Sequence, residues 1–131
     1  MIKRSEIVPA QKRAADMIRK AGIVIRDTEV ESIAVADFGL SNLSRFGAQI
    51  LTWVETARYG VKVIVLFPHQ ILPEHWHPRV GDDPGKEETI RMAWGILYQY
   101  VEGSDTIQLG SIPKEKETVF TARHEMVLHP G

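Results

Sequence analysis

The 131-residue sequence contains no cysteine, and this absence excludes several classes of site. Without cysteine the chain has no disulfide, no thiolate metal ligand and no thiol nucleophile. The sequence also has almost no net charge, −1 at pH 7, and its acidic and basic residues are interspersed. We therefore expect neither a nucleic acid nor an anionic membrane surface as its partner.

The sequence also lacks a long hydrophobic segment. Its longest apolar stretch, residues 61–67, is interrupted by Lys62 and is far too short to span a bilayer. Met1-Ile2-Lys3-Arg4 leads into polar, helix-like sequence and not into the apolar core of a signal peptide. An apolar fraction of 44% and a charged fraction of 25% are typical of a globular chain. We therefore expect one folded, cytoplasmic domain over residues 1–131.

The beginning of the chain has the pattern of helices. Apolar residues recur every three or four positions over residues 5–21, which predicts an amphipathic helix. Ser5 is a candidate N-cap, although Pro9 allows the helix to begin there instead. Gly22 is the predicted stop, because a glycine in the left-handed conformation commonly ends a helix. A second, short helix is expected after residues 27–28, where acidic residues lie near its positive end.

After this helical segment, which covers about residues 1–31, the sequence becomes rich in β-branched and aromatic residues. Glycine and proline turn formers separate most of the short runs. Many short strands after N-terminal helices are typical of an antiparallel barrel or a double-sheet roll. We therefore predict a mainly β fold, with strands at residues 33–38, 48–56, 61–67, 96–101, 106–109, 118–121 and 125–128.

A segment with two histidines carries the clearest chemical signal. On a strand, His75 and His77 point to the same face, while Trp76 between them points to the other. The turn-rich residues 78–85 reverse the chain, so that a returning strand brings Glu88 opposite the pair. Two imidazoles and one carboxylate suit a divalent first-row metal, and three protein ligands leave positions open for water or substrate. An isolated His-x-His pair also occurs by accident, so this pattern alone leaves a structural role open.

The residues after Glu88 make the pattern more specific, because Gly95 follows after six residues. His-x-His, a spacer and Glu-x6-Gly resemble the first conserved motif of the cupin superfamily. A narrower similarity, from about residue 20 to the C-terminus, resembles the D-lyxose isomerase family. Its most specific part is the pair Lys86 and Glu88, because most cupins lack that lysine. The other matching segments are Ala21-Gly22-Ile23-Val24, Asp37-Phe38-Gly39-Leu40, Arg58-Tyr59, Val65-Leu66-Phe67-Pro68 and residues 73–78, 85–89 and 98–103.

This resemblance implies a cupin-like antiparallel β-barrel, or jelly roll, and a metal-dependent sugar isomerase. The enzyme would interconvert D-lyxose and D-xylulose through an enediol intermediate. His75, His77 and Glu88 would be three of the family's four metal ligands, and Lys86 would be a catalytic residue beside the metal. The cofactor would be a divalent ion, preferably Mn²⁺, with Zn²⁺, Fe²⁺, Ni²⁺ or Co²⁺ as alternatives.

Two departures from the family pattern matter. Cupins have a glycine six residues before the first histidine, where this chain has His69, and a left-handed turn costs His more than Gly. Family members also continue past a Pro-Gly pair like Pro130-Gly131 into a second motif with the fourth ligand and a catalytic glutamate. His124 or His129 could replace that ligand, although each is more typical of a surface histidine. We therefore expect an incomplete barrel, whose open edges are covered in a homodimer or by a partner chain.

Two other functions stay open. A metal-binding cupin with different chemistry, such as an Fe(II) oxygenase, uses the same ligands, although Lys86 counts against it. An incomplete cupin could instead be a non-catalytic sugar-binding module. Arg91 could bind sugar hydroxyls or lie on the surface. The aromatic residues expected to pack in the interior are Trp53, Trp76, Trp94, Tyr98 and Tyr100.

Overall fold

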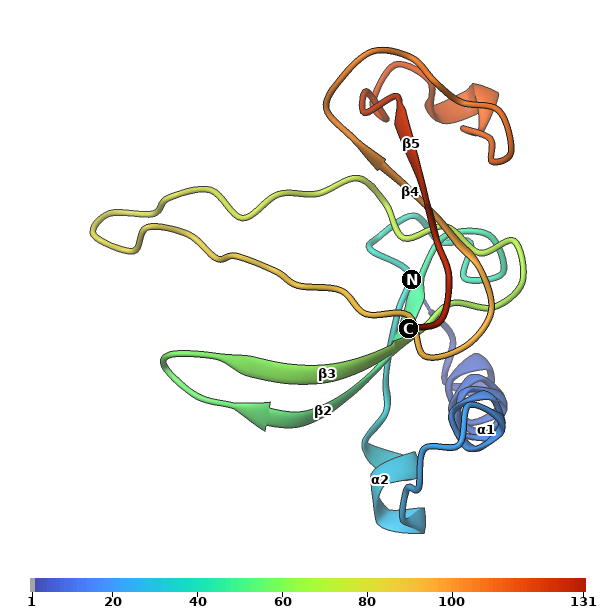
Figure 1. Ribbon diagram of the computed structural model, residues 1–131. Helices are drawn as coiled ribbons and strands as arrows, with labels where there is room; N and C mark the ends of the chain where they lie inside the picture. Colours follow the sequence, from blue (N-terminus) through green and yellow to red (C-terminus); the bar gives the residue numbers. More distant parts are fainter. Residues whose placement is uncertain (1) are drawn as a thin grey trace. The chain divides into compact units, whose positions relative to one another are not determined.

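The computed structural model describes residues 2–131, in which two helices are followed mainly by antiparallel strands (Figure 1). The chain forms two compact units, of which the first ends at Pro73 and the second begins at Glu74. No helix of the described residues is long and apolar enough to cross a membrane. The first unit contains α1 (Arg4–Lys20), α2 (Asp27–Ser32), β1 (Ala34–Ala36), β2 (Ala48–Glu55) and β3 (Gly60–Val65). The second contains β4 (Leu97–Val101), the short 3₁₀ helix η1 (Lys114–Lys116) and β5 (His124–Leu128).

The first helix begins earlier than either predicted start. Lys3 is the N-cap of α1, and its backbone N–H donates to the Glu6 carboxylate at 2.8 Å. Ser5 lies inside the first turn, so the prediction of Ser5 as the cap was wrong. Pro9 lies in the second turn, where it removes one backbone donor without ending the helix. Glu6 near the positive end of the helix supplies the start signal that Ser5 does not.

The predicted end of α1 at Gly22 is confirmed. Gly22 has φ +79°, and its N–H donates to the Arg19 carbonyl at 3.0 Å. The next N–H, that of Ile23, donates to the Ile18 carbonyl at 3.2 Å. These two bonds form a Schellman motif, which uses the left-handed glycine to turn the chain back toward the helix.

The core of the first unit lies between α1 and a sheet with the strand order β1-β2-β3. Gln49 pairs with Val65 and Leu51 with Val63, and these positions share the face that meets the helix. The helix contributes small side chains to this contact, which allow close packing against the sheet. The buried apolar residues of this core are Ala10, Ala14, Ala15, Ile18, Ile25, Ile33, Leu51, Val65 and Phe67.

The second unit has fewer strands than the sequence predicts. β4 and β5 pair antiparallel, from Leu97 opposite Leu128 to Val101 opposite His124. Residues 106–109 and 118–121 form no strand, so these two predictions were wrong. Instead, the Glu125 carboxylate accepts backbone N–H groups from residues 108–110 at 2.6 to 3.2 Å. Such bonds satisfy the backbone without a neighbouring strand. The mainly antiparallel β class is confirmed, and the described residues form no closed barrel.

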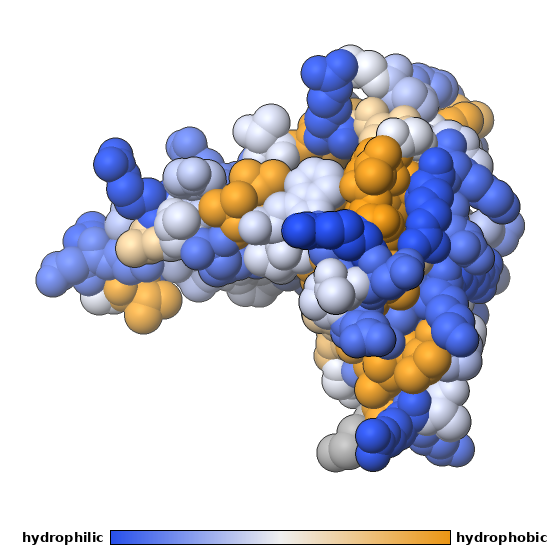
Figure 2. All heavy atoms as spheres, turned by 90° about the horizontal axis from the view of Figure 1, so that it is seen from below, coloured by the Kyte–Doolittle hydropathy of each residue, from blue (hydrophilic) through white to orange (hydrophobic). Residues whose placement is uncertain are grey.

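Several aromatic residues expected in the interior are exposed instead. Trp76 is 74% exposed, Trp53, Trp94 and Tyr98 are also exposed, and Tyr100 is half-buried. Strand alternation predicts which side chains share a face, but it does not predict whether another layer covers that face. Figure 2 shows apolar side chains gathered in several patches on one face of the molecule.

Candidate metal centre

A long loop with two arms precedes β4 (Figure 1), and the sequence places His75 and His77 on its first arm. The predicted chain reversal is confirmed, because Val80 and Asp83 exchange two backbone hydrogen bonds of 3.0 Å around a tight turn. Gly81, the first central residue of that turn, has φ +60°, as a two-residue hairpin turn favours. The prediction that strands carry the histidine pair and Glu88 was wrong, because residues 72–79 and 84–93 have no strand ladder.

Gly85 brings the two arms of this loop together beyond the turn. Its N–H donates to the Asp83 carboxylate at 2.9 Å, and its φ of +88° is one that side chains disfavour. A Cβ at position 85 would overlap the His77 carbonyl oxygen and would lie 3.2 Å from the Pro78 carbonyl carbon. The absence of a side chain at Gly85 therefore permits the close approach of the arms that carry His77 and Glu88.

The three predicted ligands are brought together at this point. His77 Nε2 lies 3.0 Å from Glu88 Oε1, and His75 Nε2 lies 3.9 Å from Glu88 Oε2. The two imidazole rings have centroids 5.4 Å apart in an edge-on arrangement. One donor atom from each of the three residues lies within 4.8 Å of the others. All three side chains are accessible to solvent, so an ion can enter without a rearrangement of the core.

This donor set fits a divalent first-row metal. Imidazole and carboxylate ligands hold such ions at about 2.0–2.2 Å, so two ligands of one ion lie at most about 4.4 Å apart. The two nitrogen–oxygen distances of 3.0 and 3.9 Å fall within that limit. A bound cation would also offset the electrostatic repulsion between the three electron-rich ligand atoms, which lie close together. The side chains are therefore already near the spacing that a common ion requires.

Lys86 lies beside the same carboxylate. Its Nζ is 3.5 Å from Glu88 Oε1, and its side chain is half-exposed. The family-specific lysine and the three candidate ligands thus form one group of four side chains. The other polar candidates lie elsewhere: Arg91 is exposed on the returning arm, and His124 Nδ1 lies 3.4 Å from Thr106 Oγ1. Neither His124 nor His129 belongs to the described cluster.

Glu74 is a residue of this region that sequence reasoning missed. Its carboxylate accepts hydrogen bonds from the Thr121 hydroxyl at 2.8 Å, from the Ala122 N–H at 3.0 Å and from the Thr121 N–H. Partial burial raises the pKa of Glu74, but the bonds from Ala122 and Thr121 lower it more, so that it lies below its usual value. The sequence offers no signal for this contact, because its partners are 47 and 48 residues away.

His69 has the left-handed conformation that its place in the cupin pattern implies. Its φ is +63°, and the Gln70 N–H donates to the Phe67 carbonyl at 2.8 Å across it. Pro68 and His69 are thus the central residues of a type II turn, whose second central position requires a positive φ. The Gln70 side chain closes this turn, since it accepts from the Phe67 N–H at 2.9 Å and donates to the Leu43 carbonyl at 2.6 Å.

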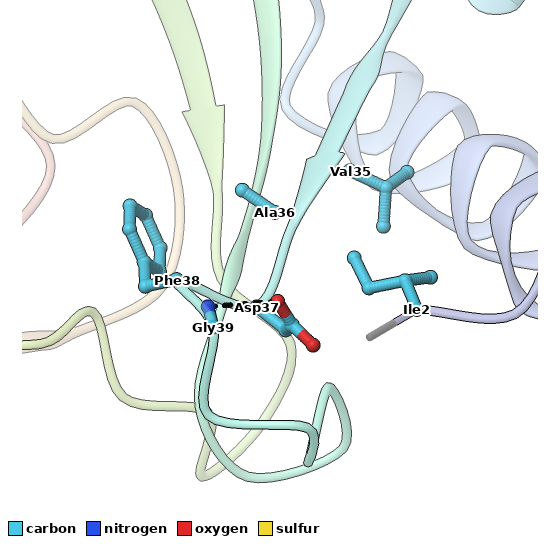
Figure 3. Close-up of a pocket in the computed structure, with 6 residues that line it drawn as sticks. All are labelled: Ile2, Val35, Ala36, Asp37, Phe38 and Gly39. Carbon is cyan, nitrogen blue, oxygen red and sulfur yellow. Dashed lines mark hydrogen bonds between the residues drawn. The ribbon is translucent and has the colours of Figure 1, made fainter.

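A separate open pocket of about 550 Å³ lies in the first unit (Figure 3). Its lining includes Asp37, whose Oδ1 accepts the Gly39 N–H at 2.9 Å. The other lining residues are mostly apolar, and none belongs to the histidine–glutamate cluster. This pocket is therefore no part of the candidate metal centre.

Comparison with known proteins identifies the family. No protein-family model matches the chain. The D-lyxose ketol-isomerase of Cohnella laeviribosi is 49% identical over 123 residues, which cover 93% of this chain and 68% of that protein. The D-lyxose ketol-isomerase of a Thermofilum species is 46% identical over 132 residues, which cover 100% of this chain and 73% of that protein. The chain belongs to the D-lyxose ketol-isomerase family.

A third member of the D-lyxose ketol-isomerase family extends the comparison. The D-lyxose/D-mannose isomerase of Thermosediminibacter oceani is 45% identical over 132 residues, with 100% of this chain and 73% of that protein covered. These relatives confirm the family resemblance and the predicted class of enzyme, a sugar isomerase. The cupin resemblance stays a prediction, since no family model matches.

Proposed function

We propose that this chain binds a divalent metal through His75, His77 and Glu88 and interconverts D-lyxose and D-xylulose at that centre. The observation that carries the proposal is the convergence of the three donor groups and Lys86 in a member of the D-lyxose ketol-isomerase family. Mn²⁺ is the preferred ion, and Zn²⁺, Fe²⁺, Ni²⁺ and Co²⁺ suit the same donors. The two imidazoles bind as neutral ligands, and Glu88 supplies the negative charge.

The reaction moves a proton between two carbons of the sugar and needs no oxidant or reductant. A proton leaves C2 of the aldose and the C1 oxygen gains one, which gives an enediol; the C2 hydroxyl then loses its proton and one is delivered to C1. A divalent ion bound at the centre would polarise the carbonyl and offset the negative charge that develops on the sugar oxygens. Lys86 is the proposed group for proton transfer, because its Nζ lies beside Glu88 at the edge of the cluster.

The direct test is to incubate the purified chain with Mn²⁺ and D-lyxose and to measure D-xylulose. D-Mannose is a second substrate to assay, because it has the configuration of D-lyxose at C2, C3 and C4 and one relative is named for both sugars. We expect Mn²⁺-dependent product formation that His75→Ala and His77→Ala abolish. Bound metal without any ketose product would overturn the catalytic proposal, and saturable sugar binding without turnover would favour a binding module.

A further inference from the structure

We propose that Glu74 is a positioning residue for the metal centre, which it serves by tying the arm with the two histidines to the segment before β5. This inference rests on the proposed metal site. Glu74 immediately precedes His75, and its carboxylate accepts three hydrogen bonds from Thr121 and Ala122. Neither residue is a candidate ligand or a neighbour of Glu88 in the sequence. The contact is therefore a link from the site to a distant part of the second unit.

The arm needs such a link because it has no strand partner. Residues 72–79 form no strand ladder, so regular strand pairing does not fix the position of this arm. A metal centre requires its ligands within a few tenths of an ångström of their bonding distances. Thr121 and Ala122 lie just before β5, which pairs with β4 over five residues. Glu74 thus connects a loop without a ladder to the paired strands of the unit.

The hydrogen bonds of Glu74 indicate a role in positioning and not in metal binding. Oε1 accepts the Thr121 hydroxyl, and Oε2 accepts the two backbone N–H groups. Both oxygens are therefore engaged by donors away from the histidine–glutamate cluster, of which Glu74 is not a member. An amide at this position keeps the arrangement, because its oxygen accepts both N–H groups and its NH₂ donates to the Thr121 hydroxyl.

Three variants at position 74 distinguish the effect of the side chain's charge from the effect of its length, or reach. Glu74→Gln keeps the reach and removes the charge, whereas Glu74→Asp keeps the charge and shortens the side chain by about 1.5 Å. Glu74→Ala removes both. The dissociation constant for Mn²⁺ alone is measured by titration calorimetry for each variant. We expect Glu74→Gln to bind Mn²⁺ within about threefold of the wild type. Glu74→Asp and Glu74→Ala should bind it at least about 10-fold more weakly, as for other residues that orient metal ligands.

The same variants are examined by amide hydrogen exchange without metal, which reports the link directly. The Thr121 and Ala122 amides should exchange slowly in the wild type and in Glu74→Gln, and rapidly in Glu74→Asp and Glu74→Ala. Equal Mn²⁺ affinities for all four proteins would overturn the inference but leave the metal site standing. Weak Mn²⁺ binding by Glu74→Gln with normal binding by Glu74→Asp would also overturn it, because the charge alone would then matter. A wild type that binds no Mn²⁺ would instead overturn the proposed function.

Glu102→Ala, at an exposed carboxylate after β4, is the matched control, and circular dichroism verifies that each variant is folded.

Discussion

Gly85 lies against the His77 carbonyl so closely that the two residues leave no room for a Cβ between them. The contact joins the outgoing arm of the loop, which carries both histidines, to the returning arm, which carries Lys86 and Glu88. Gly85 also has φ +88°, a conformation that glycine adopts without steric cost. The geometry of the candidate site thus depends on a residue that provides no ligand.

Gly85→Ala should therefore weaken metal binding. The added methyl must displace the His77 carbonyl, and the backbone conformation adds about 1–2 kcal/mol of strain. We expect Mn²⁺ affinity to fall at least 10-fold, measured by calorimetry. Gly81→Ala is the matched control, because Gly81 also has a positive φ but has open space around its Cβ position. Equal losses in the two variants would contradict the importance of the contact with His77.

Lys86→Met should separate catalysis from metal binding. The substitution keeps much of the side-chain length and removes the ammonium group 3.5 Å from Glu88 Oε1. Because a positioned acid or base contributes about 10²–10⁴-fold to a rate, we expect kcat for D-lyxose to fall by that factor. The Mn²⁺ dissociation constant should change less than about threefold. A variant with full kcat would exclude Lys86 from proton transfer, and Lys114→Met serves as the control for loss of an exposed charge.

Local signals in the sequence were sufficient for part of the fold and for the members of the cluster. Gly22 ends α1 and the glycine-containing turn at residues 80–83 reverses the chain, because both depend on residues a few positions apart. The grouping of His75, His77 and Glu88 follows from that reversal, and it does not require the strands that we expected around them.

Other features could not be predicted because they depend on partners far away in the sequence. Residues 106–109 have the composition of a strand, yet Glu125 binds the backbone N–H groups of this region and no neighbouring strand does. The exposure of Trp76 depends on whether a second layer of structure covers it, which alternation does not encode. The contact between Glu74 and Thr121 joins residues that no sequence pattern relates.

Protonation of Glu125 should lower the stability of the second unit in acid. The Leu109 N–H does most to lower the pKa of Glu125, and the Gly110 and Gln108 N–H groups and the Tyr100 hydroxyl add to it against partial desolvation. Since the folded pKa lies below the unfolded value, the stabilisation is complete above the unfolded pKa and is lost as the pH falls through the folded one. We expect Glu125→Gln to make the decline of Tm below about pH 5 shallower. An unchanged slope would contradict this assignment.

The exposed apolar faces predict association in solution. Ile64 and Trp53 are exposed on the sheet of the first unit, and Tyr98 and Met126 are exposed on the strands of the second. Exposed strand edges and contiguous apolar patches are typical sites of contact between protein chains. Light scattering should give at least twice the 14.8 kDa mass of one chain, and Ile64→Lys should reduce it. Val24→Lys, at an exposed valine outside the sheet, should not. A monomeric wild type with cooperative unfolding would contradict the prediction.

Two buried glutamines should respond to the same substitution in opposite directions. Gln49 is 0% exposed, and its side-chain oxygen and nitrogen have no hydrogen-bond partner among residues 2–131. Gln49→Leu removes two unsatisfied groups and should raise the free energy of unfolding by about 1 kcal/mol or more. Gln70 is 6% exposed and bonds to the Phe67 N–H and the Leu43 carbonyl. Gln70→Leu leaves both unpaired and should lower that free energy by about 2 kcal/mol or more, measured by urea unfolding. A loss of stability in Gln49→Leu as large as that in Gln70→Leu would show that Gln49 is hydrogen-bonded in solution.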